Sequence, residues 1–346
     1  MQPPQLKFDD KFNLPDGKLI VVSQGLGFRI HQDDIARWNP ELADAVVRLT
    51  ADGTAPMEIV EDESVDEDDG MSPVPSGEDR EGYTLSSSHL LEECVVLHLD
   101  IEADDIRRFL GAVYSMDMTR STEPKDFATI ASVLRLAYYF KIQDLIDGLL
   151  KKICTWFPKT LDEWKAFVND ESPSLVLKPD DIVTAIKVAH MTDTMSILPT
   201  ALYRCCSLDA FELARCSWHD HLMKESYAKY IGIISSSRVR LAFKAEDVCA
   251  ISLKDISPTC GTAPLCTREL DQLREKHTPE ASLASLHIID TLTLIHEDIH
   301  ARRSGESGFC DECVVHVQRG IARLQEEYWR EMPKFMGVDS IVQDWS

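Results

Sequence analysis

Four cysteines near the end of the chain have the spacing of a tetrahedral metal site. Cys310 and Cys313 form a C-x-x-C pair, in which two thiolates can bind one zinc ion. Cys260 and Cys266 form a second pair, with a glycine and a proline between them that favour a turn. Because the two pairs flank a helical stretch, the pattern predicts one structural Zn²⁺ site with four cysteine ligands.

Two alternatives to a metal site remain for these cysteines. They could be unrelated core thiols, with Cys249 as a substitute ligand if one pair is incomplete. A redox-active pair would need a thioredoxin-like setting, which this part of the sequence does not provide. The acidic spacer Asp311-Glu312 should raise the pKa of both flanking thiols unless a metal offsets it.

The motif HEDIH is the only other pattern suited to metal chemistry. His296 and His300 lie one helical turn apart with Glu297 between them, as in zinc proteases of the H-E-x-x-H type. However, Asp298 adds a charge inside the motif, and no third histidine follows at a suitable distance. A protease is therefore the remote alternative, and the chain is not expected to be an enzyme or to have a small-molecule substrate.

Charge and composition limit the partners and the compartment. The 346 residues carry a formal net charge of −23, which opposes binding to phosphate backbones. From Glu246 to the end, 10 Lys and Arg stand against 18 Asp and Glu, so a zinc site there would not grip DNA. With no secretory signal and no membrane-spanning run, the ten cysteines are expected to be reduced, in the cytoplasm, the nucleus or both.

The elements that position these residues indicate an α+β protein in three parts. Residues 13–157 read as a small sheet with helical hairpins, interrupted by a polar insertion at about 50–92. Residues 158–245 form a mainly helical extension, and 246–346 form a small helical module that carries the cysteines. Within the first part, residues 19–23 and 28–31 predict a hairpin with its turn at 25–27, residues 94–100 a third strand and residues 104–115 a helix with Ile106, Phe109, Leu110 and Val113 on one face.

The insertion contains a run of acidic residues with no basic residue among them. Such a run cannot bury enough apolar surface to order itself, so it predicts a disordered loop. A docking tail for a basic partner, or a phosphorylation site at Ser72 or Ser76, is the functional alternative. The acidic residues are Glu58, Glu61, Asp62, Glu63, Asp66, Glu67, Asp68 and Asp69.

The first part resembles the BTB/POZ family. An opening Asp16 is followed by an apolar strand and by Phe28-x-Ile30-His31, which is similar to the family's first motif. A strand and a helix similar to the family's middle motif follow. The most specific signature is similar to "L..A..Y.I..L" and consists of Leu134, Ala137, Phe140, Ile142 and Leu145. The rest of the chain resembles an expanded fungal group of BTB proteins with a helical middle and a cysteine-containing end.

The resemblance implies assembly rather than catalysis. BTB domains associate with themselves and recruit cullin ubiquitin-ligase scaffolds or corepressors. The chain is therefore expected to be an adaptor that binds itself and other proteins; an acidic transcriptional cofactor without DNA contact is the alternative. Gln32 stands where the transcription-factor branch has a basic residue after the histidine, so groove binding of corepressors is not expected. The prolines near the start also leave little material for an N-terminal strand.

Overall fold

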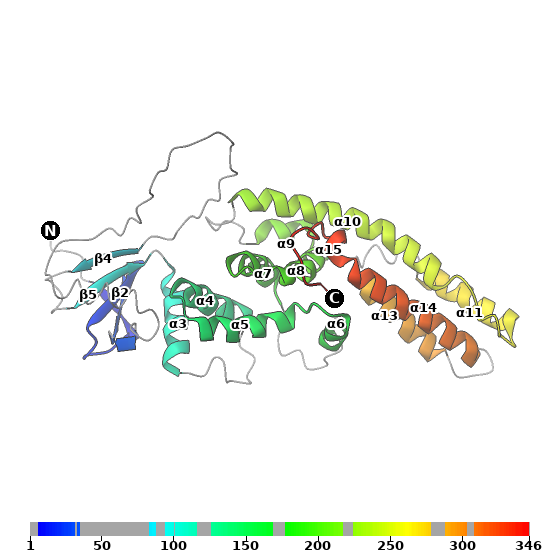
Figure 1. The fold of residues 1–346 in the computed structure, drawn as a ribbon, viewed down its shortest axis with the longest axis horizontal. Coiled ribbons are helices and arrows are strands. Elements are labelled where there is room, and N and C mark those ends of the chain that lie inside the picture. Colours follow the sequence, from blue (N-terminus) through cyan, green and yellow to red (C-terminus); the bar gives the residue numbers. More distant parts are fainter. Residues whose placement is uncertain are drawn as a thin grey trace. The chain divides into compact units, whose positions relative to one another are not determined.

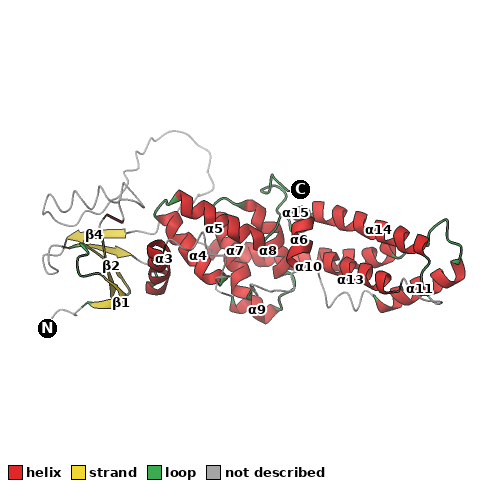
Figure 2. Ribbon diagram, turned by 90° about the horizontal axis from the view of Figure 1, so that it is seen from below, coloured by secondary structure: helices red, strands yellow, loops and turns green. Residues whose placement is uncertain are grey.

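The computed structural model of the chain divides into two compact units, Met1–Lys151 and Lys152–Ser346. It describes residues 6–31, 33–34, 83–87, 94–99, 101–115, 126–168, 177–216, 224–277, 288–302 and 308–345. The first unit holds a sheet and helices, and the described part of the second is helical (Figures 1 and 2). The α+β class is confirmed. The predicted boundary at residue 245 is wrong, because it falls inside one continuous helix, α10 (Lys224–Ser252).

The sheet of the first unit is mixed, with strand order β1-β3-β2-β5-β4. The central strand β2 pairs antiparallel with β3 on one side and parallel with β5 on the other, where Leu19 lies opposite Val95. The predicted hairpin and third strand are confirmed. The strands are β1 (Lys7–Asn13), β2 (Leu19–Ser23), β3 (Leu26–Ile30), β4 (Tyr83–Ser87) and β5 (Val95–Leu99).

The hairpin between β2 and β3 closes with two residues in the left-handed region. Gln24 has φ 48° and Gly25 has φ 78°. A two-residue turn with both φ values positive matches the right-handed twist of the strands it joins. This turn fixes the register in which Val21 lies opposite Phe28.

Apolar side chains bury both faces of the central strands. On one face, Val21 and Leu99 meet Phe109 of α3 (Ala103–Ser115) and Leu136 of α4 (Phe127–Tyr139). The helix α5 (Gln143–Trp156) follows α4. On the other face Ile20, Val22 and Val96 form a separate cluster. Of the predicted inward stripe of the 104–115 helix, Ile106, Phe109 and Leu110 are buried and Val113 is half-buried.

The opposite face depends on an N-terminal strand that the sequence did not predict. Leu6 and Phe8 pack against the cluster of Ile20, Val22 and Val96, and β1 pairs parallel with β3. The prolines lie before this strand and leave its amide groups free to pair. The expectation of little strand-forming material at the N-terminus is therefore wrong.

The buried carboxylate of Asp9 accepts hydrogen bonds from the backbone of β1 and from α3. Its side chain is 4% exposed and accepts from the backbone N–H groups of Lys11 and Phe12 at 2.9 and 3.0 Å. It also accepts from Nε of Arg107 in α3 at 2.8 Å. These hydrogen bonds satisfy the buried carboxylate. They coincide with a break in the pairing of β1 with β3 between Phe8 and Asn13, where the register shifts.

The predicted loop at 50–92 is wrong for its last part. Residues Tyr83–Ser87 form β4, which pairs antiparallel with β5 along its whole length. The acidic run, Ser72 and Ser76 lie outside the described residues.

The second unit is built from helices packed in antiparallel pairs and around α10. Ile182, Ile186 and Ala189 lie on one face of a helix in this unit and are buried. The elements are α6 (Leu161–Val168), α7 (Pro179–Met191), η1 (Met195–Ile197), α8 (Leu198–Cys205), α9 (Ala210–Arg215), α10, α11 (Ala263–Lys276), α13 (Ile288–Ala301), α14 (Asp311–Arg330) and α15 (Met332–Phe335).

Aromatic side chains from helices far apart in sequence form the centre of this unit. Trp164 of α6 lies 5.7 Å, ring to ring, from both Tyr203 of α8 and Trp329 of α14. Both indoles are satisfied: Nε1 of Trp164 donates to Asp290 at 3.3 Å, and Nε1 of Trp329 donates to the Lys159 carbonyl at 2.9 Å. These contacts anchor α14, which contains Cys313 and is capped by Cys310.

Among the described helices, none combines the length and apolar character needed to cross a membrane.

Candidate metal centre

The four cysteines predicted to form one site come together where two helices begin. Their Sγ atoms all lie within 4.8 Å of one another. Cys266 lies in the first turns of α11, Cys310 is the residue that caps the start of α14, and Cys313 lies in the first turn of α14. Cys260 lies in the turn that joins α10 to α11. The prediction that these residues converge is confirmed.

The spacing of each pair follows from local helix geometry. In α14 the backbone N–H of Cys313 donates to the carbonyl of Cys310 at 3.0 Å, so both sulfurs lie at the same helix end. In α11 the N–H of Cys266 donates to the carbonyl of Thr262 at 3.1 Å. Helix starts carry unpaired N–H groups and a partial positive charge, which stabilise thiolates.

The sulfur positions fit one tetrahedral ion. Sγ of Cys260 lies 3.7 Å from Sγ of Cys310. With Zn–S bonds near 2.3 Å, two sulfurs of a tetrahedron are about 3.8 Å apart. The four Sγ atoms as a set spread over as much as 4.8 Å, somewhat wider than this ideal separation.

Backbone N–H groups point at two of the sulfurs. The N–H of Ser257 donates to Sγ of Cys313 at 3.3 Å, and the N–H of Cys310 donates to Sγ of Cys266 at 3.4 Å. Such bonds orient metal ligands and offset part of their negative charge. The contribution of Ser257 was not predicted; the Ser-Pro-Thr turn at 257–259 was the only signal in the sequence that could have indicated it.

The turn before α11 is tied to the start of α14. Oγ1 of Thr259 donates a hydrogen bond to Glu312 at 3.2 Å. The same Oγ1 lies 2.9 Å from Oγ of Ser257 and forms a second hydrogen bond with it. Glu312 is therefore turned toward the turn hydroxyls. Cys266 and Cys313 are fully buried, whereas Cys260 and Cys310 are partly exposed, so the cluster has one buried and one accessible side.

The pKa values of the clustered thiols are shifted in different directions. Burial raises the pKa of Cys310, but the backbone N–H of Cys313 and the thiols of Cys313, Cys260 and Cys266 outweigh it, and the pKa is lowered to about 7. Burial raises the pKa of Cys313 and that of Cys260. The expectation that the acidic spacer raises both pKa values of the C-x-x-C pair is wrong for Cys310. A thiol with a pKa near 7 loses its proton readily at neutral pH, which favours metal uptake.

The HEDIH motif is not completed by a third ligand in the part of the chain that is described. There the four cysteines are the only group of three or more His, Cys, Asp or Glu side chains placed to share an ion. Asp298 instead accepts from Lys276 and His277 of the α11 end at 2.6 and 2.7 Å, which clamps α11 to α13. The side chain of Cys249, the substitute ligand, lies outside the described residues.

The BTB-like motif positions divide into a core set and a surface pair. Phe28, Leu134, Ala137 and Phe140 are buried, while Ile142 and Leu145 are half-buried. Asp16 accepts from Nε2 of His31 at 3.1 Å, and this hydrogen bond lowers the pKa of Asp16. In this chain the opening aspartate therefore pairs with the histidine of its own motif. Gln32 lies outside the described residues.

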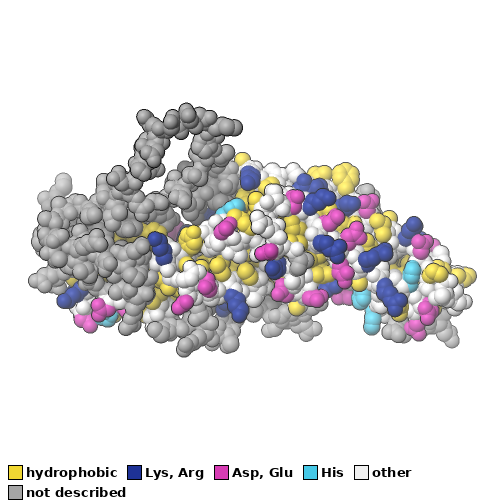
Figure 3. Space-filling model, in the orientation of Figure 1, with side chains coloured by type: hydrophobic (Ala, Val, Ile, Leu, Met, Phe, Trp, Pro, Cys, Tyr) yellow, Lys and Arg dark blue, Asp and Glu magenta, His cyan; other side chains and the backbone are white. Residues whose placement is uncertain are grey.

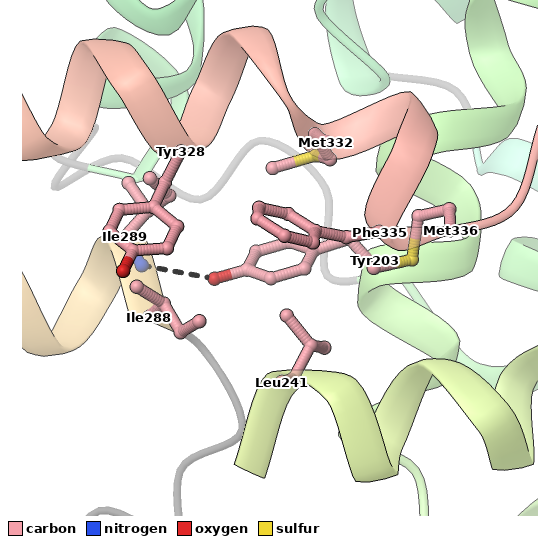
Figure 4. Close-up of a pocket in the computed structure, with 8 residues that line it drawn as sticks. All are labelled: Tyr203, Leu241, Ile288, Ile289, Tyr328, Met332, Phe335 and Met336. Carbon is pink, nitrogen blue, oxygen red and sulfur yellow. Dashed lines mark hydrogen bonds between the residues drawn. The ribbon is translucent and has the colours of Figure 1, made fainter. Parts of the chain in front are cut away.

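Two small internal cavities are lined by apolar core residues. The cavity in the second unit measures about 10 Å³, which holds at most one water molecule. Tyr203, Leu241, Tyr328 and Phe335 close around it, and the Tyr203 hydroxyl accepts from the backbone N–H of Ile289 at 3.1 Å (Figure 4). This space is a packing gap and cannot hold a substrate.

Comparison with known proteins returned no relative. No family model matches the sequence, and neither a curated protein nor a solved structure shows significant similarity to it. The functional conclusion therefore depends on the chain's own residues and their geometry.

Proposed function

We propose that this chain is a non-catalytic protein-interaction scaffold, with a BTB/POZ-like first unit that assembles and a helical second unit held by a structural zinc ion. The observation that carries the proposal is the four-cysteine cluster. Four thiolates saturate a tetrahedral Zn²⁺ and leave no position for water or substrate. The zinc ion would then hold the N-terminal ends of α11 and α14 against the turn that follows α10.

The topology of the first unit supports the BTB-like half of the proposal. A β-hairpin, a parallel strand beside it, one helix and a helix pair follow in the order that the resemblance implies. The motif residues that pack in the family, such as Leu134 and Ala137, pack here as well. Domains of this kind work through their surfaces, and so the expected partners are a second copy and other proteins, a cullin scaffold among them.

Affinity purification of the full chain from cells, followed by identification of bound proteins, tests this function. Recovery of a cullin or of a defined set of other proteins supports a scaffold. Two results together contradict the proposal: no other protein is recovered, and light scattering shows only a monomer at about 100 µM. That concentration would populate even a complex with a micromolar dissociation constant.

The protease alternative receives its own test in the same preparation. His296→Ala and Glu297→Ala should leave both the bound proteins and the metal content unchanged. Proteolytic activity that disappears in both variants would contradict a non-catalytic role.

A further inference from the structure

The four-cysteine cluster has one pair of sulfurs on its accessible side. Cys260 and Cys310 are partly exposed, whereas Cys266 and Cys313 are fully buried. The cluster lies where α11 and α14 begin, at the right-hand end of the second unit in Figure 1. In Figure 3, side chains of the colour class that includes cysteine reach the surface of this end. A small dissolved oxidant therefore meets the sulfurs of Cys260 and Cys310 first.

The two accessible cysteines also lie outside the helices. Cys260 is in the turn before α11, and the Gly261 that follows it has no heavy atom within 4 Å of the place where a Cβ would lie. Cys310 precedes the first turn of α14 with an extended backbone, φ −70° and ψ 155°. By contrast, Cys266 and Cys313 lie inside helices, and each sulfur accepts from a backbone N–H, at 3.4 and 3.3 Å. The accessible pair is therefore the one that can change its separation without unwinding a helix.

We propose that Cys260 and Cys310 form a disulfide under oxidation by a peroxide, and that the zinc ion is then released. Their Sγ atoms lie 3.7 Å apart, close to the separation that a tetrahedral zinc imposes. A disulfide would shorten this separation to about 2.05 Å, so zinc binding by both sulfurs and the disulfide exclude each other. The inference rests on the proposed zinc site and deepens it, because it makes the structural site responsive to oxidation.

The step balances with hydrogen peroxide as the oxidant. One of the two thiolates attacks a peroxide oxygen and the O–O bond breaks, which gives a sulfenic acid and, with a proton from solvent, one water. The second thiolate attacks the sulfenic sulfur, the S–S bond forms, and the oxygen leaves as a second water with another solvent proton. The two sulfurs together lose two electrons, which the peroxide gains. Cys266 and Cys313 alone leave the tetrahedron half empty, so Zn²⁺ departs.

Oxidation would change how the three segments are joined. The disulfide keeps the turn before α11 tied to the start of α14, because Cys260 and Cys310 belong to these two segments. The start of α11, which carries Cys266, loses its link through the common ion. Hydrogen exchange of the first turns of α11 should therefore become faster after oxidation.

Two measurements on the full-length, zinc-loaded protein test the proposal after treatment with excess hydrogen peroxide. A chromogenic chelator should report release of about one zinc ion per chain. Peptide mapping without reduction should find a disulfide between Cys260 and Cys310, and a dithiol reductant followed by added zinc should reverse both changes. Cys205 and Cys206 are buried outside the cluster, serve as internal controls and should remain thiols.

Cys260→His removes the disulfide and keeps a zinc ligand, since a histidine nitrogen can replace a thiolate in a tetrahedral site. This variant should hold its zinc and release it to peroxide at least roughly tenfold more slowly, because Cys310 has lost its accessible partner. The matched control Cys216→Ser should release zinc at the rate of the unaltered chain. If Cys260→His holds no zinc, peptide mapping of the unaltered chain decides alone.

Three results would overturn the inference and leave the structural zinc in place. They are bound zinc that resists excess peroxide, release accompanied by a disulfide between Cys310 and Cys313, and equal release rates from zinc-loaded Cys260→His and the unaltered chain. A chain purified without zinc contradicts the metal half of the proposed function, and this inference with it.

Discussion

The Sγ atoms of Cys260 and Cys310 lie 3.7 Å apart, although 50 positions separate these residues in the chain. One sulfur comes from a turn and the other from a helix start, and hydrogen bonds from Ser257 and Thr259 of the turn tie these two segments together. Because two other sulfurs complete the set, a metal ion at their centre would join three segments of backbone.

The first prediction concerns metal content. Purified protein should carry about one zinc ion per chain, and Cys310→Ser or Cys313→Ser should lower that value sharply. A structural zinc contributes on the order of 10 kcal/mol to folding in small modules. Its loss should therefore unfold the turn before α11 and the starts of α11 and α14, which carry the four cysteines. The sheet of the first unit should remain folded, as hydrogen exchange of its amides would report.

The matched control is Cys216→Ser in the same unit. Sγ of Cys216 donates to the carbonyl of Glu212 at 3.1 Å, a bond that a serine hydroxyl can keep. This variant should retain its zinc. Full zinc content in the Cys310→Ser and Cys313→Ser variants would show that the metal binds elsewhere.

The second prediction concerns Asp9 and Arg107. Asp9→Asn should lower the free energy of unfolding by about 2 kcal/mol at pH 7, because it leaves a buried bond network incomplete. Burial raises the pKa of Asp9, but hydrogen bonds from Phe12, Arg107 and Lys11 outweigh it and the pKa lies below 3.8. The carboxylate therefore stabilises the fold above pH 4, and this contribution is lost as the pH falls through the lowered pKa.

Urea unfolding of the unaltered chain and of the Asp9→Asn variant across pH 2 to 7 measures this difference. The gap between their free energies of unfolding should close at the acid end. A gap that stays constant with pH would assign the effect to packing instead of charge.

The third prediction separates the insertion from the strand beside it. Deleting residues 55–80 should change the free energy of unfolding by no more than about half a kcal/mol, because an acidic loop of this composition buries little. Extending the deletion to residue 87 removes β4 and its ladder with β5, and should cost more than roughly 2 kcal/mol. Equal stabilities of the two deletions would mean that β4 contributes nothing.

The fourth prediction concerns the hydroxyl of Tyr203. Tyr203→Phe should destabilise the second unit by about 1–3 kcal/mol, because it leaves the buried N–H of Ile289 without an acceptor at the start of α13. Tyr138→Phe is the control, since that ring is 47% exposed. Thermal unfolding followed at the helical signal compares the two, and equal melting temperatures would reject the role given to this bond.

The parts of the fold that the sequence predicted are those in which local pattern and burial agree. The run from Leu19 to Val22 is apolar throughout, and a glycine follows it at the turn. The cysteine pairs could be predicted for a similar reason. Each pair lies at a turn or helix start with few alternatives, and four thiolates have one common geometry.

The remaining parts depend on contacts distant in sequence. The strand β1 contains Lys7, Asp9, Asp10 and Lys11, a composition typical of a loop. Its buried carboxylate is acceptable only because Arg107 reaches it from α3, 98 positions later. Similarly, α10 buries Ser237, whose hydroxyl donates to the carbonyl of Phe335 at 3.0 Å, and exposes Phe243. This reversal obscures the helical period, and for that reason the boundary at 245 was predicted inside a continuous helix.

The order of the strands sets the kinetics of folding. The pairing of β2 with β3 needs only a two-residue turn, and hairpins of this kind form within microseconds. The pairing of β2 with β5 joins Leu19 to Val95, roughly 76 positions later, and must close that whole loop before any contact forms. Since closure entropy grows only with the logarithm of length, shortening the loop by a third gains about 0.4 kcal/mol, and folding accelerates no more than about twofold. Length changes within the acidic run should therefore alter the folding rate little.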